Sequence, residues 1–141
     1  MKIILNKCYG GFDVSDEAYR LYAKKKGLEL YKYESDYDFK NPTYRKVENG
    51  GNEISTCYFT KDFGEEAKIS DDDYNKYCLY IREDYRNDEA LIEVVEELGN
   101  RASGRFGELE IIEIPDNSFY KIDEYDGIET IYYSDSEIHI K

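Results

Sequence analysis

The chain has 141 residues, the size of one ordinary domain, and a formal net charge of −13 at pH 7. Acidic residues outnumber lysine and arginine by 32 to 19, which argues against a nucleic-acid polymer or an anionic membrane as partner. A hydrophobic content of 40%, with 16 tyrosines and 6 phenylalanines, is too high for a disordered chain. We therefore expect a single ligand-binding domain over residues 1–141.

The N-terminal residues lack the pattern of a signal peptide, because only three apolar residues follow Lys2 before polar residues return. No apolar run approaches the ~20 residues that cross a bilayer. The cysteines Cys8, Cys57 and Cys78 are odd in number and lack C-x-x-C spacing, so we expect free thiols. The expected location is the cytoplasm.

The first third of the chain predicts a strand, a helix and a second strand. Residues 3–5 form a short apolar run that suits a buried strand. Ser15 is placed to cap a helix over residues 16–26, in which acidic residues open the first turn and three lysines close the last. Residues 28–33 alternate in the manner of a strand.

From residue 36 to residue 73 the apolar pattern weakens, and we expect a decorating insertion there. Within it, the glycine-rich residues 49–52 separate two strand-like runs and predict a hairpin between residues 44–47 and 54–59. Asp71, Asp72 and Asp73 lack the alternating ligands and the glycine of a calcium loop. They are expected to begin a helical turn.

The clearest element is a helix after Asn87, which we expect to cap it. Leu91, Val94, Val95 and Leu98 recur at helical spacing, glutamates occupy the opposite face, and Gly99 ends the helix.

Strands are predicted at residues 109–114, 120–125 and 128–133, the last two joined by a turn at Asp126-Gly127. Six to eight strands with two main helices indicate an α+β fold. We expect a mixed, largely antiparallel sheet with both helices on one face.

The patterns that catalysis requires are mostly missing. The one histidine, His139, lies in an alternating strand pattern two residues from the C-terminus and is expected to be a strand residue. There is no H-E-x-x-H motif and no P-loop, and carboxylate pairs are too common to mark a site. We expect a non-catalytic protein without a metal or cofactor. An enzyme that degrades a nucleotide signal with a carboxylate and a tyrosine or His139 is the least favoured alternative.

Three loops are candidates for a ligand site. The first, residues 8–12, has two glycines that allow backbone to approach a ligand, just before the N-terminus of a helix. Its alternative interpretation is a tight turn with Phe12 in the core. The second, residues 100–107, combines two arginines, a hydroxyl and a phenylalanine, which suit a phosphate and a stacked base. Its alternative is a helix-ending loop whose arginines pair with glutamates.

The third loop, residues 82–87, leads into the second helix and is by itself more typical of an ion-paired surface turn. We expect the three loops to meet at one end of the sheet. The candidate ligand-binding residues in these loops are Gly10, Gly11, Phe12, Arg82, Arg86, Asn87, Arg101, Ser103, Arg105 and Phe106.

Several short blocks resemble a family of small phage and prophage proteins, the first family of Thoeris anti-defence sponges to be described. They lie at the two ends of the chain and not in residues 36–73. The blocks are NKCYGGF (6–12), SDEA (15–18), RND (86–88), LIEVVEELG (91–99), ASGRF (102–106), IEIPD (112–116) and DEYDGIE (123–129).

The resemblance implies sequestration without cleavage of the cyclic ADP-ribose-type signal that bacterial TIR-domain immune enzymes make. It implies pockets at an interface between subunits, and for some members a further site for cyclic oligonucleotides. A homo-oligomer, a dimer or higher, is therefore expected, and the tyrosine-rich strands suit self-association. The alternative from another class is an acidic protein that inhibits a basic host protein by surface mimicry, using the glutamate face of the second helix and Asp71–Asp73.

Overall fold

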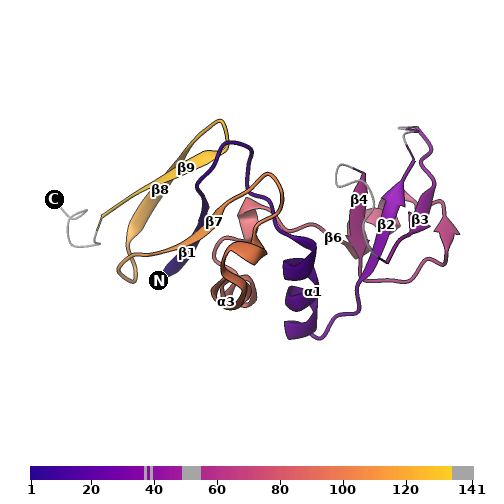
Figure 1. Cartoon of the computed structure of the whole chain (residues 1–141), viewed down its shortest axis with the longest axis horizontal. Coiled ribbons are helices and arrows are strands. Elements are labelled where there is room, and N and C mark those ends of the chain that lie inside the picture. The colour runs from indigo at the N-terminus through magenta and orange to yellow at the C-terminus, as the bar shows by residue number, and fades with distance from the viewer. Residues whose placement is uncertain (37, 39, 49–54, 135–141) are drawn as a thin grey trace. The chain divides into compact units, whose positions relative to one another are not determined.

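The computed structural model describes residues 1–36, 38, 40–48 and 55–134 (Figure 1). The chain forms two compact units, one of Met1–Lys26 with the chain from Ile81 onward, the other of Gly27–Tyr80. The α+β class, the antiparallel pairing and the two main helices are confirmed. The strands form three sheets in the described residues, where we expected one. The predicted insertion at residues 36–73 lies within the second unit.

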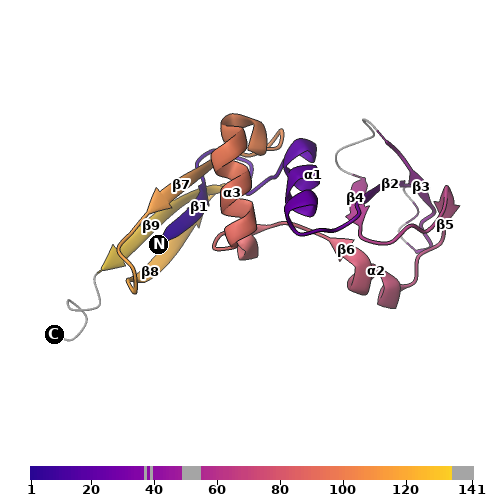
Figure 2. The same cartoon turned by 90° about the horizontal axis from the view of Figure 1, so that it is seen from below.

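The first unit is built around the strand β1 (Lys2–Asn6), which pairs antiparallel with β7 (Leu109–Glu113). The helix α3 (Glu89–Leu98) packs against both strands and against α1 (Asp16–Lys25) (Figure 2). Alternate residues of a strand point to opposite faces, and β1 is covered on both, so its apolar run is fully buried.

The helix ends follow the local signals with one correction. Ser15 caps α1, its hydroxyl accepting the backbone N–H of Ala18 at 3.1 Å. Asp88, not Asn87, caps α3, because its carboxylate accepts the backbone N–H of Leu91 at 3.1 Å. A carboxylate is the stronger acceptor beside the positive end of the helix dipole.

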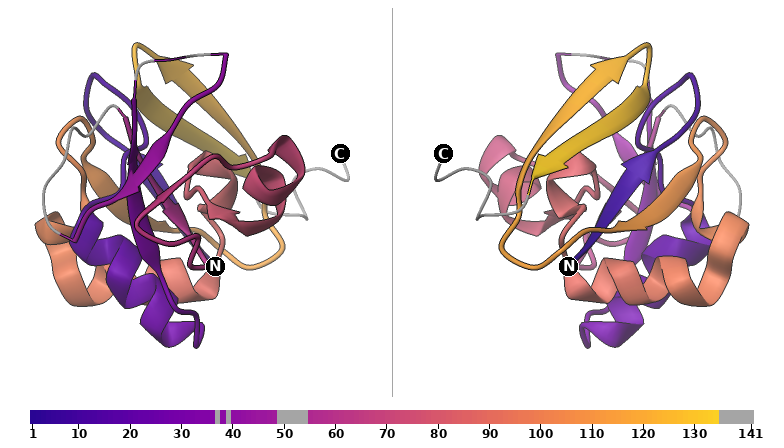
Figure 3. Two further views of the ribbon diagram at one scale, coloured as in Figure 1. Left: turned by 90° about the vertical axis from the view of Figure 1, so that its right-hand side faces the viewer. Right: turned by 90° about the vertical axis from the view of Figure 1, so that its left-hand side faces the viewer.

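The hairpin of β8 (Phe119–Tyr125) and β9 (Ile128–Ser134) forms as predicted, with its turn at Asp126 and Gly127. Both turn residues have positive φ, 49° and 92°, which suits a two-residue hairpin turn. β9 contacts β1, and the hairpin, coloured yellow, lies beside that strand (Figure 3, right). One face of the hairpin packs Ile122 and Ile131 against a buried cluster of Ile3, Leu5 and Ile114.

The second unit contains a five-stranded antiparallel sheet in the order β5-β3-β2-β4-β6 and the helix α2. The bounds are β2 Tyr31–Ser35, β3 Tyr44–Lys46, β4 Thr56–Phe59, β5 Glu66–Ala67, α2 Asp71–Tyr77 and β6 Cys78–Leu79. The predicted pairing of residues 44–47 with 54–59 is wrong, because β2 lies between β3 and β4 and pairs with both. The predicted turn at residues 49–52 lies outside the described residues. β2 begins at Tyr31, three residues later than the predicted start at residue 28.

Aromatic rings form the core of the second unit. Tyr33 and Phe59 are fully buried, with ring centroids 5.6 Å apart and an edge-to-face geometry. Phe59 makes further edge-to-face contacts with Tyr44 at 5.9 Å and Phe63 at 5.4 Å. The Tyr33 hydroxyl donates to the carbonyl of Gly64 at 2.8 Å, so the buried polar group is satisfied. This explains why a tyrosine-rich, weakly patterned segment still folds.

All three cysteines have free thiols, and Cys57 packs against this aromatic core. Burial raises the pKa of the Cys57 thiol from 9.0 to about 12. The neutral thiol therefore stabilises the fold below pH 9, and that contribution is lost as the pH rises from 9 towards 12.

We expect Cys57 of the folded protein to react with iodoacetamide at pH 8 about 1000-fold more slowly than in urea, since the thiolate is the nucleophile. Peptide mass spectrometry over time measures both rates. Equal rates in the folded and unfolded protein would contradict this burial.

Asp71, Asp72 and Asp73 form the first turn of α2, as expected, and Ser70 caps the helix. Within the described ranges no group of three or more His, Cys, Asp or Glu side chains is arranged to hold a metal ion. No helix of the described part has the length and apolarity that a membrane crossing requires.

Candidate functional site

The structure brings the first and second loops into direct contact within the first unit. Gly10 has a φ of 137° and lies against the main chain of Phe106, where an added Cβ would be 2.1 Å from the carbonyl oxygen. The Cys8 thiol donates to the same carbonyl at 3.4 Å. Gly10 therefore serves the packing of one loop on the other, which no side chain at that position would allow.

Asp13 organises the second loop. Its carboxylate accepts the backbone N–H of Phe106 at 3.1 Å, and its carbonyl accepts that of Gly104 at 2.9 Å. The Ser103 hydroxyl accepts the backbone N–H of Leu109 at 2.8 Å. These contacts hold the loop in shape, and the backbone N–H groups of Gly104 and Phe106 are used within the protein.

Asn6 links the turn of the β8–β9 hairpin to these two loops, and the sequence alone did not single it out. This fully buried residue donates from its side-chain amide to the carbonyls of Cys8 at 2.9 Å and Gly127 at 2.6 Å. Its side-chain oxygen accepts the backbone N–H of Glu108 at 2.8 Å. An asparagine at the end of a buried strand was the available signal, since a buried amide must find such partners.

Arg86 and Phe12, two residues of the predicted site, lie in the interior of the first unit. The Arg86 guanidinium makes a two-point ion pair with Glu129, at 2.6 and 3.2 Å, and donates to the carbonyls of Ile4 at 3.1 Å and Glu83 at 3.0 Å. It also covers the ring of Phe12, 5.6 Å from the centroid. Phe12 is 9% exposed, so neither residue presents a free surface to a ligand.

The other residues of the third loop are occupied at the surface. Arg82 lies 3.4 Å from Glu83, as the ion-paired interpretation expects. The Asn87 amide donates to the Tyr120 hydroxyl at 3.2 Å. The third loop therefore stabilises the first unit through these contacts. Its two arginines are both ion-paired and do not form a cationic site.

The exposed aromatic and cationic side chains of the first two loops are Tyr9, Arg101, Arg105 and Phe106, and we call these four residues the Arg105 rim. Tyr9 is 70% exposed and Phe106 is 51% exposed. The Arg105 guanidinium lies over the Phe106 ring, 5.6 Å from its centroid, and has no ion pair with any residue the structure describes. Arg101 pairs with Glu17 at 2.9 Å. A cation and two rings are the groups that bind a phosphate and a base.

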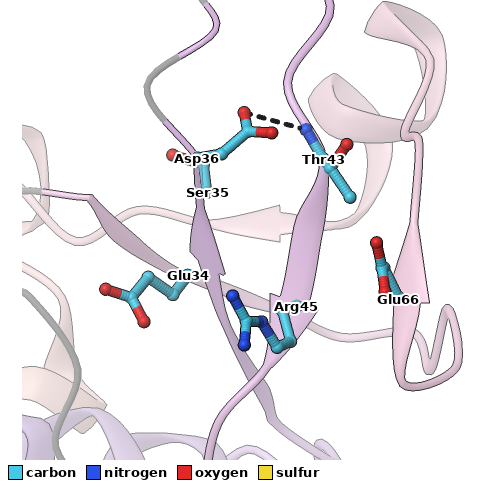
Figure 4. A pocket seen from close by; sticks show the side chains of 6 residues that line it. All are labelled: Glu34, Ser35, Asp36, Thr43, Arg45 and Glu66. Atoms are coloured by element: carbon cyan, nitrogen blue, oxygen red, sulfur yellow. Dashed lines mark hydrogen bonds between the residues drawn. The ribbon is translucent and has the colours of Figure 1, made fainter.

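A depression of about 540 Å³ lies elsewhere, on the sheet of the second unit (Figure 4). Arg45 lies in one cross-strand row with Glu34 and Glu66, and Asp36 is beside them. Backbone N–H groups of Thr43 and Asp38 lower the pKa of Asp36. Three carboxylates against one arginine make this depression unsuitable for an anion, and no predicted site residue lines it.

The glutamate face of α3 is partly neutralised. Glu96 lies 2.8 Å from Lys2, while Lys25 lies 2.6 Å from Glu97 and 3.7 Å from Glu93. These pairs reduce the acidic surface that a mimic of a polyanion would present.

Comparisons of the chain with protein-family models, with curated proteins and with solved structures find no match.

Proposed function

We propose that the protein binds a nucleotide-derived signal of the cyclic ADP-ribose type at the Arg105 rim and holds it unaltered. The observation that carries this proposal is the Arg105 guanidinium, exposed beside Phe106 without a carboxylate partner among the described residues. In a chain with a net charge of −13, such a cation is available to an anionic ligand.

The chemistry of the rim suits the two halves of such a ligand. A guanidinium donates two parallel hydrogen bonds to a phosphate, and exposed rings such as Phe106 and Tyr9 offer faces on which a purine stacks. The contacts of Asp13 and Gly10 hold the loop backbone before any ligand arrives. This preorganisation lowers the entropic cost of binding.

The identity of the signal rests on the resemblance to the Thoeris anti-defence sponges. In that setting the protein would remove the product of a TIR-domain enzyme from the cytoplasm of an infected or lysogenic bacterium and so block its defence. The four side chains of the rim supply phosphate-binding guanidinium groups and rings for stacking, but no acid–base pair. Because cleavage would need such a pair, these residues favour sequestration. The ion-paired glutamates of α3 give the acidic-mimic alternative less support.

Replacing Arg105 with alanine is expected to weaken binding of a cyclic ADP-ribose isomer about 10- to 100-fold, because a charge-assisted contact is lost. Titration calorimetry measures the affinity, and the melting temperature should stay unchanged because the side chain is exposed. Arg20→Ala is the matched control, since it removes the same charge from the exposed surface of α1.

Two outcomes would count against the proposal. Equal affinity of Arg105→Ala and the unmodified protein would remove the site assignment. Mass spectrometry of the ligand released after heat denaturation tests the fate of the signal, and a hydrolysed product would identify an enzyme instead.

A further inference from the structure

The strand β7 is hydrogen-bonded to a neighbouring strand along one side only. In an antiparallel pair, successive residues direct their backbone N–H and C=O groups alternately towards the partner strand and away from it. The N–H of Lys7 donates to the carbonyl of Glu108 at 2.8 Å, and the N–H of Ile114 donates to that of Met1 at 3.0 Å. The even-numbered residues of β7 therefore face β1. The odd-numbered ones direct their backbone groups outward: Leu109, Ile111 and Glu113.

This outward side, which we call the outer edge of β7, has no neighbouring strand in the described part of the chain. At its start, the N–H of Leu109 donates to the hydroxyl of Ser103 at 2.8 Å. The N–H and C=O groups of Ile111 and Glu113 make no hydrogen bond with any residue that the structure describes. A row of unpaired backbone groups along a strand is a template on which a further strand can form.

The side chains along the outer edge combine apolar and acidic groups. Glu110 and Glu113 are exposed, and Ile111 and Ile112 are half-buried. Alternate residues point to opposite faces, so Ile111 shares one face with Glu113, while Ile112 shares the other with Glu110. Each face thus offers one apolar side chain and one carboxylate to a strand that pairs with the edge.

The charge along the edge identifies the kind of strand that it accepts. Glu108, Glu110 and Glu113 are exposed, and none of them has an ion pair within the described ranges. The glutamates of α3 differ, because Lys2 and Lys25 partly neutralise them. A segment with Lys or Arg opposite Glu110 and Glu113 gains cross-strand pairs of opposite charge. A second copy of the chain would instead repeat these glutamates in an interface between two molecules that each carry a charge of −13.

We propose that the outer edge of β7 binds an extended basic segment of a partner protein, which adds to the β1–β7 pair as a third strand. An antiparallel segment exchanges hydrogen bonds with both N–H and both C=O groups of Ile111 and Glu113. Its side chains opposite residues 113 to 110 are, in that order, basic, apolar, apolar and basic. The main-chain bonds supply affinity, and the side chains supply specificity. This inference does not depend on the Arg105 rim or its ligand.

A synthetic peptide with this pattern, Thr-Thr-Lys-Val-Val-Lys-Thr-Thr, tests the edge in the full chain. We expect the fluorescence anisotropy of the labelled peptide to show saturable binding that weakens as salt rises from 50 to 500 mM. A peptide with glutamate in place of both lysines should bind at least about 10-fold more weakly, because like charges then oppose each other. Methylation of the backbone nitrogens of the first lysine and the second valine should weaken binding at least about 10-fold, because it removes the donors that face β7.

Two variants of the protein separate backbone pairing from charge. Glu113→Pro removes an outward N–H and should weaken binding of the basic peptide about 10-fold, while the chain still folds, because an edge strand tolerates proline where its N–H faces solvent. Glu110→Lys should weaken it about 10-fold by replacing an attraction with a repulsion. Asp84→Lys is the matched control for charge and should leave the affinity unchanged. Asp84 is exposed on the segment in which the carbonyl of Arg86 accepts the N–H of Ile4, on the other side of β1.

Hydrogen exchange followed by NMR tests the pairing residue by residue. In the free protein, the amide hydrogens of Ile111 and Glu113 should exchange faster than those of Glu110 and Ile112, which face β1. Saturation with the basic peptide should slow exchange at Ile111 and Glu113 at least about 10-fold. Slow exchange at both positions in the free protein would overturn the proposal, because the edge would already be covered, for example by a second copy. No binding up to about 1 mM peptide, or binding that leaves these two amides unprotected, would overturn it as well.

Discussion

Replacing Glu129 with alanine is expected to lower the free energy of unfolding by about 3–5 kcal/mol, because it leaves a buried cation without its partner. The side chains of Glu129 and Arg86 are 7% and 12% exposed, and they form a two-point pair. Glu129 also accepts the backbone N–H of Asn6 at 2.8 Å, so a second buried donor loses its acceptor. Urea denaturation followed by far-UV circular dichroism measures the change.

The double variant Arg86→Met with Glu129→Leu separates the charge from the packing. Removing both members of a buried pair is often nearly neutral, so we expect it to be more stable than Glu129→Ala. A loss of less than about 1 kcal/mol in Glu129→Ala would show that the pair is not buried in solution.

Phe59→Ala is expected to lower the free energy of unfolding by about 3–5 kcal/mol, since it opens a cavity within the second unit. Phe59 is fully buried among its aromatic neighbours, with 0% of its surface accessible to solvent. The near-UV signal of the tyrosines should weaken, and amide hydrogens of β2 and β4 should exchange faster. Hydrogen exchange read by mass spectrometry locates the loss.

The same substitution at Phe106 provides the control for Phe59. Phe106 is 51% exposed, so its removal should change stability by less than about 1 kcal/mol. Similar losses at both positions would contradict the aromatic core as described.

Elements that depend on neighbouring residues were predictable from the sequence. The periodicity of residues 91–98 and the cap at Ser15 located the two main helices to within a few residues. The Asp126-Gly127 dipeptide located the β8–β9 turn, because positive φ at both positions favours those residue types. The contact between the first two candidate loops agrees with part of the expectation that all three loops meet at one end of the sheet.

Features that join distant residues were decided by the tertiary structure alone. The sequence by itself determined the fold class, the helices and the hairpin, since these depend on spacing and local backbone preference. It predicted the wrong neighbour for β3, because β2 lies between β3 and β4. It left open the ion pair of Arg86 with Glu129, 43 positions away, and the hydrogen bonds of Asp13 to the second loop. An arginine in a loop carries no local sign of whether a carboxylate will reach it. Only the packing of the chain distinguished Arg86, paired with Glu129, from the exposed Arg105.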